Sequence, residues 1–276
     1  MIVLILTLFL SICTLVLFVI GFFNFIVEPV YFYVFKKPAY VYFYPVLKKL
    51  SPELHEILRS EIPFYSKLAT KKQQYFEHRV VEFLSTYQFH GKESLEITPY
   101  MRVKIASVYV MITFGMREYL TQTIDKIIIY PSSYYSTIND TFHNGEFNPR
   151  YKAVLFSWQH FMEGNELESD NLNLGIHEFA HVLHYNGMKK RNNSAAFFAQ
   201  CYNQIRKDVK HPPNAKLLLD SGYFREYAFT NDFEFLAVIM EHFFETPDTF
   251  KQKFPELFRK VKQMINYTPP GSIYST

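Results

Sequence analysis

The sequence of 276 residues predicts an α+β fold. Apolar residues recur at helical spacing in several segments before residue 115. Short runs of β-branched and aromatic residues, bounded by proline or polar turns, follow between residues 127 and 158. Helical spacing returns after residue 172. We therefore expect a helical N-terminal part, a small mixed sheet and a helical C-terminal part.

An apolar run precedes this pattern, because residues 1–27 contain no charged side chain. As a helix, the run would measure about 40 Å, whereas the hydrocarbon core of a bilayer is about 30 Å thick. A cleavable signal peptide would need a basic start and a small-residue cleavage site, and neither is evident. We therefore expect one transmembrane helix at 1–27. Lysines at 36, 37, 48 and 49 follow it, so the positive-inside rule predicts a cytoplasmic remainder.

Residues 28–49 are interpreted as an aromatic and basic linker. Its tyrosines have two possible roles, either as an aromatic belt at the membrane surface or as side chains packed against the folded domain. These tyrosines are Tyr31, Tyr33, Tyr40, Tyr42 and Tyr44. Residues 50–276 form the predicted folded domain, which is long enough for one hydrophobic core or two small lobes.

Turn and cap residues set the expected order of elements in this domain. Ser51 and Pro52 indicate a helix start, and further helices are expected at about 71–89 and after Thr98. Two strands are expected at 127–130 and 152–158, with Asn144-Gly145 as a turn between them. The later helices are expected at 172–185, where Asn186-Gly187 would end the helix, and at 194–208, 230–245 and 247–266.

Composition excludes some functions. The formal net charge of +3 gives no sign of direct nucleic-acid binding. There are two cysteines, and Cys13 lies in the apolar run, so Cys201 is the single thiol of the folded part and no internal disulfide is expected there. A lone thiol fits a reducing compartment.

The segment 174–184 contains the motif that predicts chemistry. His177 and His181 are four residues apart, so on a helix both imidazoles lie on one face, one turn apart. Two neutral imidazoles in this arrangement suit Zn²⁺, and Glu178 is placed to act as a general base. This HExxH pattern predicts one zinc ion per chain. The apolar neighbours Ile176, Ala180 and Leu183 indicate a buried helix.

A catalytic zinc site needs a third protein ligand. The long HExxHxxGxxH pattern is excluded, because Gly187 stands where its third histidine would be. Glu234 and Glu241 lie seven residues apart on one predicted helix. Apolar residues surround Glu234, which favours it as the ligand, whereas Glu241 would then hydrogen-bond a ligand histidine. From the residues alone, both assignments stay open.

The chain resembles the MtfA family of bacterial zinc peptidases, which is related to the catalytic domain of anthrax lethal factor. The resemblance rests on HEFAH at 177–181, VLFSW at 154–158 and TNDFEFLAV at 230–238, with looser matches at 94–115 and 127–134, and covers most of residues 50–250. It implies a zincin-like fold and a peptidase, with an aminopeptidase favoured over an endopeptidase. It also implies that His177 and His181 are zinc ligands, that Glu178 is the catalytic base and that Glu234 is the third ligand.

The resemblance further implies that Tyr227 assists the oxyanion or the leaving group. Peptide hydrolysis would then proceed by attack of zinc-bound water on a peptide carbonyl, with the edge of strand 152–158 offered to an extended substrate. Trp158 is interpreted as a core residue, the alternative being a wall of the substrate groove. The family usually has an acid where this chain has His184, which we expect to face solvent rather than to support a ligand.

A second hypothesis is a membrane-tethered regulatory protein with a structural or vestigial zinc site. The resemblance supplies its motive, because a soluble relative binds and sequesters a transcriptional repressor of sugar uptake. Glu178 distinguishes the two hypotheses, since a protein that only binds has no need of a general base.

Overall fold

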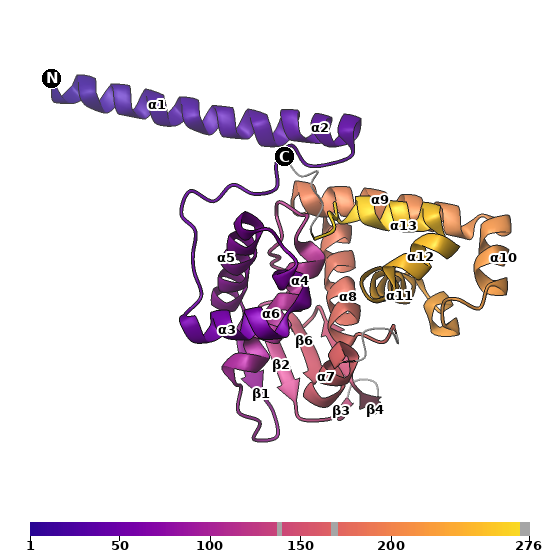
Figure 1. Cartoon of the computed structure of the whole chain (residues 1–276). Coiled ribbons are helices and arrows are strands. Elements are labelled where there is room, and N and C mark those ends of the chain that lie inside the picture. The colour runs from indigo at the N-terminus through magenta and orange to yellow at the C-terminus, as the bar shows by residue number, and fades with distance from the viewer. Residues whose placement is uncertain (137–139, 167–170, 271–276) are drawn as a thin grey trace. The chain divides into compact units, whose positions relative to one another are not determined.

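The computed structural model describes residues 1–136, 140–166 and 171–270 (Figure 1). It divides the chain into two compact units, residues 1–41 and 42–276. Each unit is described by itself.

The first unit is dominated by a helix that runs from Ile2 to Phe35. It consists of α1 (Ile2–Phe22), a π-helical turn (Phe23–Val27) and α2 (Glu28–Phe35). The π-helical turn lies just before Pro29, whose nitrogen has no hydrogen for the helical ladder. The helix is long and apolar enough to cross a membrane, and a signal sequence would pass the same test. Residues 28–35, expected in the linker, are therefore helical.

The second unit contains a four-stranded mixed sheet with the order β1-β2-β6-β5. Its strands are β1 (Gln88–Gly91), β2 (Lys126–Tyr130), β5 (Gly145–Asn148) and β6 (Ala153–Ser157). β1, β2 and β6 are parallel, while β5 runs antiparallel to β6 with Phe147 opposite Val154. A separate antiparallel pair joins β3 (Tyr134–Ser136) to β4 (Thr141–His143). The predicted α+β class with a small mixed sheet is confirmed.

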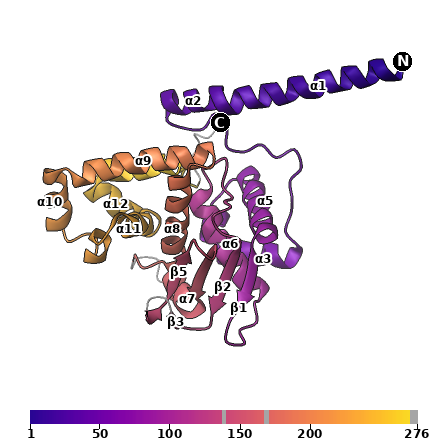
Figure 2. The same cartoon turned by 180° about the vertical axis from the view of Figure 1, so that it is seen from behind.

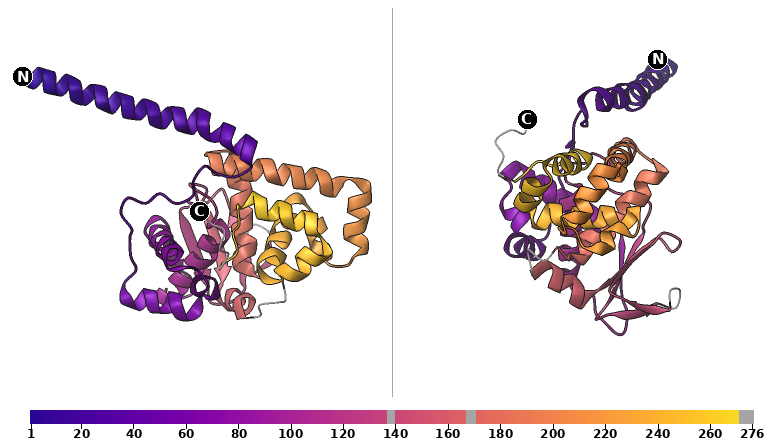
Figure 3. Two further views of the ribbon diagram at one scale, coloured as in Figure 1. Left: turned by 45° about the horizontal axis from the view of Figure 1, so that its top comes forward. Right: turned by 90° about the vertical axis from the view of Figure 1, so that its right-hand side faces the viewer.

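Helices make up the rest of the unit. Before the first strand come α3 (Pro52–Glu61), α4 (Pro63–Ser66) and α5 (Thr70–Thr86), α6 (Pro99–Thr113) lies between β1 and β2, and α7 (Trp158–Glu166) directly follows β6, the last strand. After the sheet come α8 (Leu174–Lys189), α9 (Asn193–Lys210), α10 (Pro212–Asp220), a 3₁₀ helix (Glu226–Phe229), α11 (Asp232–Glu245), α12 (Pro247–Lys253) and α13 (Pro255–Met264). The sheet and the later helices lie on opposite sides of α8 (Figures 2 and 3).

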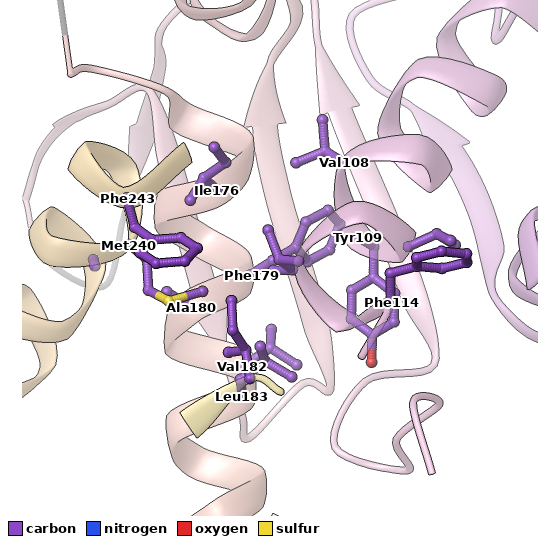
Figure 4. Packing of buried hydrophobic residues seen from close by; sticks show 14 of the residues in the cluster. Val108, Tyr109, Phe114, Ile176, Phe179, Ala180, Val182, Leu183, Met240 and Phe243 are labelled. Carbon is purple, nitrogen blue, oxygen red and sulfur yellow. The ribbon is translucent and has the colours of Figure 1, made fainter. Parts of the chain in front are cut away.

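α8 is the central element of the core. On its sheet side, the Phe179 ring meets Tyr109 of α6 at 5.0 Å and Phe156 of β6 at 5.5 Å between ring centroids. On its other side, Met240 and Phe243 of α11 pack next to Ala180 (Figure 4). All six side chains are at most 2% exposed, so α8 is fixed from two directions. This burial holds the HExxH segment rigid.

Two glycines were interpreted wrongly as turn residues. Gly187 does not end a helix, because α8 continues to Lys189, and Gly187 lets α9 approach closely. A Cβ atom there would lie 3.3 Å from the side chains of Phe198 and Ala199. Gly145 begins strand β5 instead of forming a turn, and a Cβ atom there would lie 2.7 Å from Oε1 of Glu178. Close approach of neighbouring atoms, and not a turn, explains both glycines: the contacts leave no room for a side chain at residue 145 and are tight at residue 187.

Other sequence predictions also need correction. The predicted strand 152–158 is not an edge strand, because β6 pairs with β2 on one side and with β5 on the other. Trp158 lies outside it, as the first residue of α7, and its ring stacks on Phe161 in the core. The predicted helix 247–266 is two helices, since Pro255 cannot continue the hydrogen bonding of α12. β1, α7, α10 and the β3–β4 pair were not predicted.

The start of the second unit is held by Arg79, a fully buried arginine of α5. Its Nε donates a hydrogen bond of 2.6 Å to the hydroxyl of Tyr44, and its Nη atoms donate to the backbone carbonyls of Thr113, Phe114 and Met116 at 2.9–3.1 Å. The Tyr42 hydroxyl also donates to the carbonyl of Phe114. Tyr42 and Tyr44 therefore pack against the folded unit, which is the second of the two roles expected for them.

Candidate metal centre and active site

The HExxH segment lies in the first two turns of α8. Asn173 caps the start of this helix, because its Oδ1 accepts a hydrogen bond of 3.0 Å from the amide of Ile176. The helical spacing places the rings of His177 and His181 next to each other, with centroids 4.7 Å apart. The side chains of the two histidines are 13% and 12% exposed, so they face a nearly closed space.

Glu234 reaches the histidine pair from the first turn of α11. Asn231 starts this helix by accepting hydrogen bonds from the amides of Phe233 and Glu234. One Glu234 oxygen lies 3.1 Å from Nε2 of His177, and the other lies 3.6 Å from Nε2 of His181. Donor atoms held about 2.1 Å from a tetrahedral ion would be roughly 3.4 Å apart, so these spacings suit one metal ion.

The donor set also fits a metal chemically. One ligand atom from each of the three residues lies within 4.8 Å of the others. Oε2 of Glu234 is buried, and although it lies 3.1 Å from Nε2 of His177, it has no partner with hydrogen-bond geometry among the described residues. A buried carboxylate oxygen without a donor is unfavourable unless a cation compensates it. Two imidazole nitrogens and one carboxylate are the donors that Zn²⁺ takes in catalytic sites.

The Glu178 side chain extends from α8 toward β5. It is 5% exposed, and burial raises the pKa of its carboxyl group to about 7. The His177 side chain next to it acts in the opposite direction on this pKa. Gly145 of β5 comes so close that even a methyl group there would collide with the carboxylate. The absence of a side chain at residue 145 therefore leaves room for Glu178.

Tyr227 stands at the mouth of the site on the 3₁₀ helix before α11. Its ring centroid is 6.3 Å from that of His177, and the side chain is half exposed. Burial raises the pKa of its hydroxyl to about 12, and the Glu234 carboxylate close by adds to this effect. The hydroxyl therefore stays protonated at neutral pH and is able to donate a hydrogen bond.

Glu241 contacts the back of the histidine pair. Its Oε1 lies 2.5 Å from Nδ1 of His177, and the side chain is 1% exposed. Arg225, which the sequence did not single out, binds the same carboxylate through two nitrogens at 2.7 and 3.0 Å. The only feature of the sequence that points to Arg225 is its position two residues before Tyr227. The two acids of α11 thus lie on different nitrogens of His177, Glu234 at Nε2 and Glu241 at Nδ1.

The expectation that His184 faces solvent is wrong. His184 is 7% exposed and lies between the rings of Phe233 and Tyr202, at centroid distances of 4.1 and 4.9 Å. It is seven residues after His177 and shares its helix face, which α9 and α11 cover. Burial lowers its pKa to about 4. His184 is therefore a neutral core residue at physiological pH.

A cavity of about 450 Å³ opens next to the histidine pair. Its lining combines the N-terminal end of α8 with α7, β5 and the Arg225–Glu241 pair. The residues are Asn144, Gly145, His160, Glu163, Gly164, Leu172, Leu174, His177, Glu178, Arg225 and Glu241. β5 lies at the edge of the four-stranded sheet, so its outer side faces this region.

An α+β fold in which an HExxH helix meets a glutamate from a second helix is typical of metallopeptidases. The model of the glucose-regulated metallopeptidase family M90 matches residues 46–266. The chain belongs to this family. It is also similar to proteins named Mlc titration factor A, being 20% identical to that of Klebsiella pneumoniae over 229 residues and 21% identical to that of Yersinia pestis over 231 residues.

These alignments cover 75% and 78% of this chain, and 84% of each relative. A Synechocystis protein, slr2042, is 27% identical over 246 residues, which span 80% of this chain and 86% of that protein. The resemblance to the MtfA family inferred from the sequence is confirmed.

Proposed function

We propose that this protein is a membrane-anchored, zinc-dependent peptidase with a zincin-like fold. The observation that carries the proposal is the convergence of His177, His181 and Glu234, from two helices, on a space that fits one metal ion. Membership of a metallopeptidase family supports the reaction class. In this proposal, the three residues hold one Zn²⁺ per chain, and the ion would supply Lewis acidity to the peptide carbonyl and to a water molecule.

The residues around the site have distinct roles in this proposal. Glu178, nearly enclosed between α8 and β5, accepts the proton of the attacking water and passes it to the leaving amine. Tyr227 donates a hydrogen bond to the oxygen on which charge develops, from a position next to the histidine pair. The backbone of β5 pairs with an extended substrate, because β5 is an edge strand next to Glu178.

The location follows from the first unit. The helix Ile2–Phe35 would span the membrane once, and under the positive-inside rule the basic residues after it favour a cytoplasmic second unit. A peptide or protein substrate would be bound there. The family resemblance favours an aminopeptidase, and the cavity next to Glu178 has room for a substrate side chain.

A second candidate function is a regulatory protein that binds a partner such as a transcriptional regulator, with a zinc site that has no catalytic role. The name Mlc titration factor A of the relatives supports it. The number of candidate ligands supports a catalytic role instead. The site offers three protein ligands, whereas structural zinc sites usually have four.

The test uses the full-length protein in detergent. Its zinc content is measured, and cleavage of a peptide library is recorded with and without a chelator. We expect one zinc per chain and chelator-sensitive cleavage, and we expect Glu178→Gln to keep the zinc and lose the cleavage. A Glu178→Gln variant that cleaves as fast as wild type contradicts the proposed mechanism. A wild-type protein that cleaves nothing but captures a partner supports the regulatory function.

A further inference from the structure

Arg225 connects the metal centre with the cavity wall and has no role in the chemistry described above. Its Nη1 lies 2.7 Å from Oε2 of Glu241, and its Nη2 lies 3.0 Å from Oε1. Oε1 in turn lies 2.5 Å from Nδ1 of His177, whereas Nη2 of Arg225 is 3.5 Å from that nitrogen. Three side chains, from a loop and from two helices, thus form one continuous chain of charge-assisted contacts.

We propose that Arg225 is a positioning residue that fixes the Glu241 carboxylate, and through it the ring of His177, for zinc binding. This inference rests on the proposed function, in which His177 is a zinc ligand. Glu241 is 1% exposed, so its carboxylate has lost its hydration and depends on the groups around it. The planar fork of a guanidinium binds both carboxylate oxygens at once and therefore sets the plane of the carboxylate.

The plane of Glu241 determines where His177 points. A carboxylate that accepts from Nδ1 fixes both the rotation of the imidazole and the tautomer in which Nε2 is free to bind a metal. Without the guanidinium, Glu241 would keep one partner and would be free to turn. The Nε2 atom of His177 would then lose its alignment with Glu234, which lies 3.1 Å away.

The same guanidinium also fixes the cavity wall. Nη1 of Arg225 donates a hydrogen bond of 2.5 Å to the carbonyl of Asn171, and Oγ1 of Thr246 donates one of 2.7 Å to Oδ1 of Asn171. Asn171 has a φ of +57°, in the left-handed region that asparagine occupies more readily than most residues, and these two hydrogen bonds hold it there. The next residue, Leu172, lines the cavity beside the metal centre. Arg225 therefore holds the substrate wall as well as the ligand.

The experiment measures zinc affinity directly, by competition with a chromophoric chelator, on the full-length protein in detergent. We expect Arg225→Gln and Glu241→Gln each to weaken zinc binding about 10- to 100-fold. Because Arg225 acts through Glu241, the double variant should bind zinc no more weakly than Glu241→Gln alone. Arg225→Lys keeps the charge without the fork and should fall between wild type and Arg225→Gln. It also serves as the test if Arg225→Gln does not fold.

Arg206→Gln is the matched control. Arg206 of α9 pairs with Asp232, which lies on α11 as Glu241 does. The Arg206 side chain is 35% exposed, compared with 28% for Arg225, and no contact with the histidine pair is found for it among the described residues. We expect its zinc affinity to stay within twofold of wild type. At saturating zinc, Arg225→Gln should raise the KM for a cleaved peptide more than Glu241→Gln does, because Arg225 donates a hydrogen bond to Asn171.

Two results would overturn the inference. One is a zinc affinity of Arg225→Gln and Arg225→Lys equal to wild type while wild type binds zinc and cleaves peptides. The other is a double variant whose loss is the full sum of the single losses, because Arg225 would then act independently of Glu241. A wild-type protein that binds no zinc would overturn the proposed function itself, and is a separate outcome.

Discussion

The close approach of β5 to Glu178 gives a sharp test of the catalytic geometry through the substitution Gly145→Ala. A Cβ atom at residue 145 would lie 2.6 Å from Cδ1 of Leu174 and 2.7 and 2.9 Å from Oε1 and Cγ of Glu178. These distances are too short for contacts between non-bonded atoms, so either the neighbouring side chains or the backbone of β5 must move. All three are side-chain atoms, and the cheapest relief is therefore a displaced Glu178 and Leu174 rather than a displaced strand.

The magnitudes follow from this geometry. Overpacking by one methyl group typically costs about 1–3 kcal/mol, and movable side chains place this case at the lower end, about 1 kcal/mol. A catalytic group displaced by about 1 Å loses roughly 100-fold in rate. We therefore expect Gly145→Ala to fold, to keep its zinc and to lose about 10- to 100-fold in kcat. Zinc is kept because none of the three contacts belongs to a metal ligand.

The assay compares zinc content, urea unfolding and kcat on a cleaved peptide for wild type and Gly145→Ala. The control is Gly187→Ala in the same helix as Glu178, where the nearest atoms are 3.3 Å away and belong to α9. This control should change stability slightly and leave kcat unchanged. If Gly145→Ala has wild-type kcat and wild-type zinc, then β5 does not constrain the base and the reasoning fails.

Three further predictions concern other parts of the unit. Arg79→Gln should lower the free energy of unfolding by about 3 kcal/mol or more, since it leaves buried carbonyls without a donor. An unchanged midpoint of urea unfolding would contradict this. Burial lowers the pKa values of His184 and His242 to about 4, so the unfolded state binds more protons between pH 6.5 and 4. Stability should therefore fall as the pH drops through this window, and a urea midpoint that stays flat from pH 7 to 4 would count against it. Tyr227→Phe should lower kcat about 10- to 100-fold at unchanged zinc content, and equal rates would remove the hydroxyl from the mechanism.

The sequence predicted that His177 and His181 lie side by side because their relation is local. A spacing of four residues on a helix places two side chains on one face whatever the rest of the fold does. Glu234 lies 53 residues after His181, and its approach depends on how α11 packs against α8. Residue patterns therefore left open which of Glu234 and Glu241 is the third ligand. In the structure both glutamates contact His177, on opposite nitrogens.

The missed features share one physical cause, which is that their role depends on contacts distant in sequence. Arg225 is an ordinary polar residue in a loop until α11 brings Glu241 next to it. The sequence favours turns at Gly145 and Gly187 because glycine is common in turns, while here glycine allows close packing. His184 was expected in solvent because the covering α9 and Phe233 could not be placed from the sequence.

The Arg79 contacts also limit how far the second unit can travel from the long helix. They pin Tyr42 and Tyr44, so only residues 36–41 lie between the end of α2 at Phe35 and the folded unit. A fully extended chain of this length has a reach of roughly 25 Å. With the helix embedded in a bilayer, this short connection would keep the second unit, and with it the proposed metal site, near the bilayer. In the proposed function, a substrate would therefore have to come close to the bilayer surface.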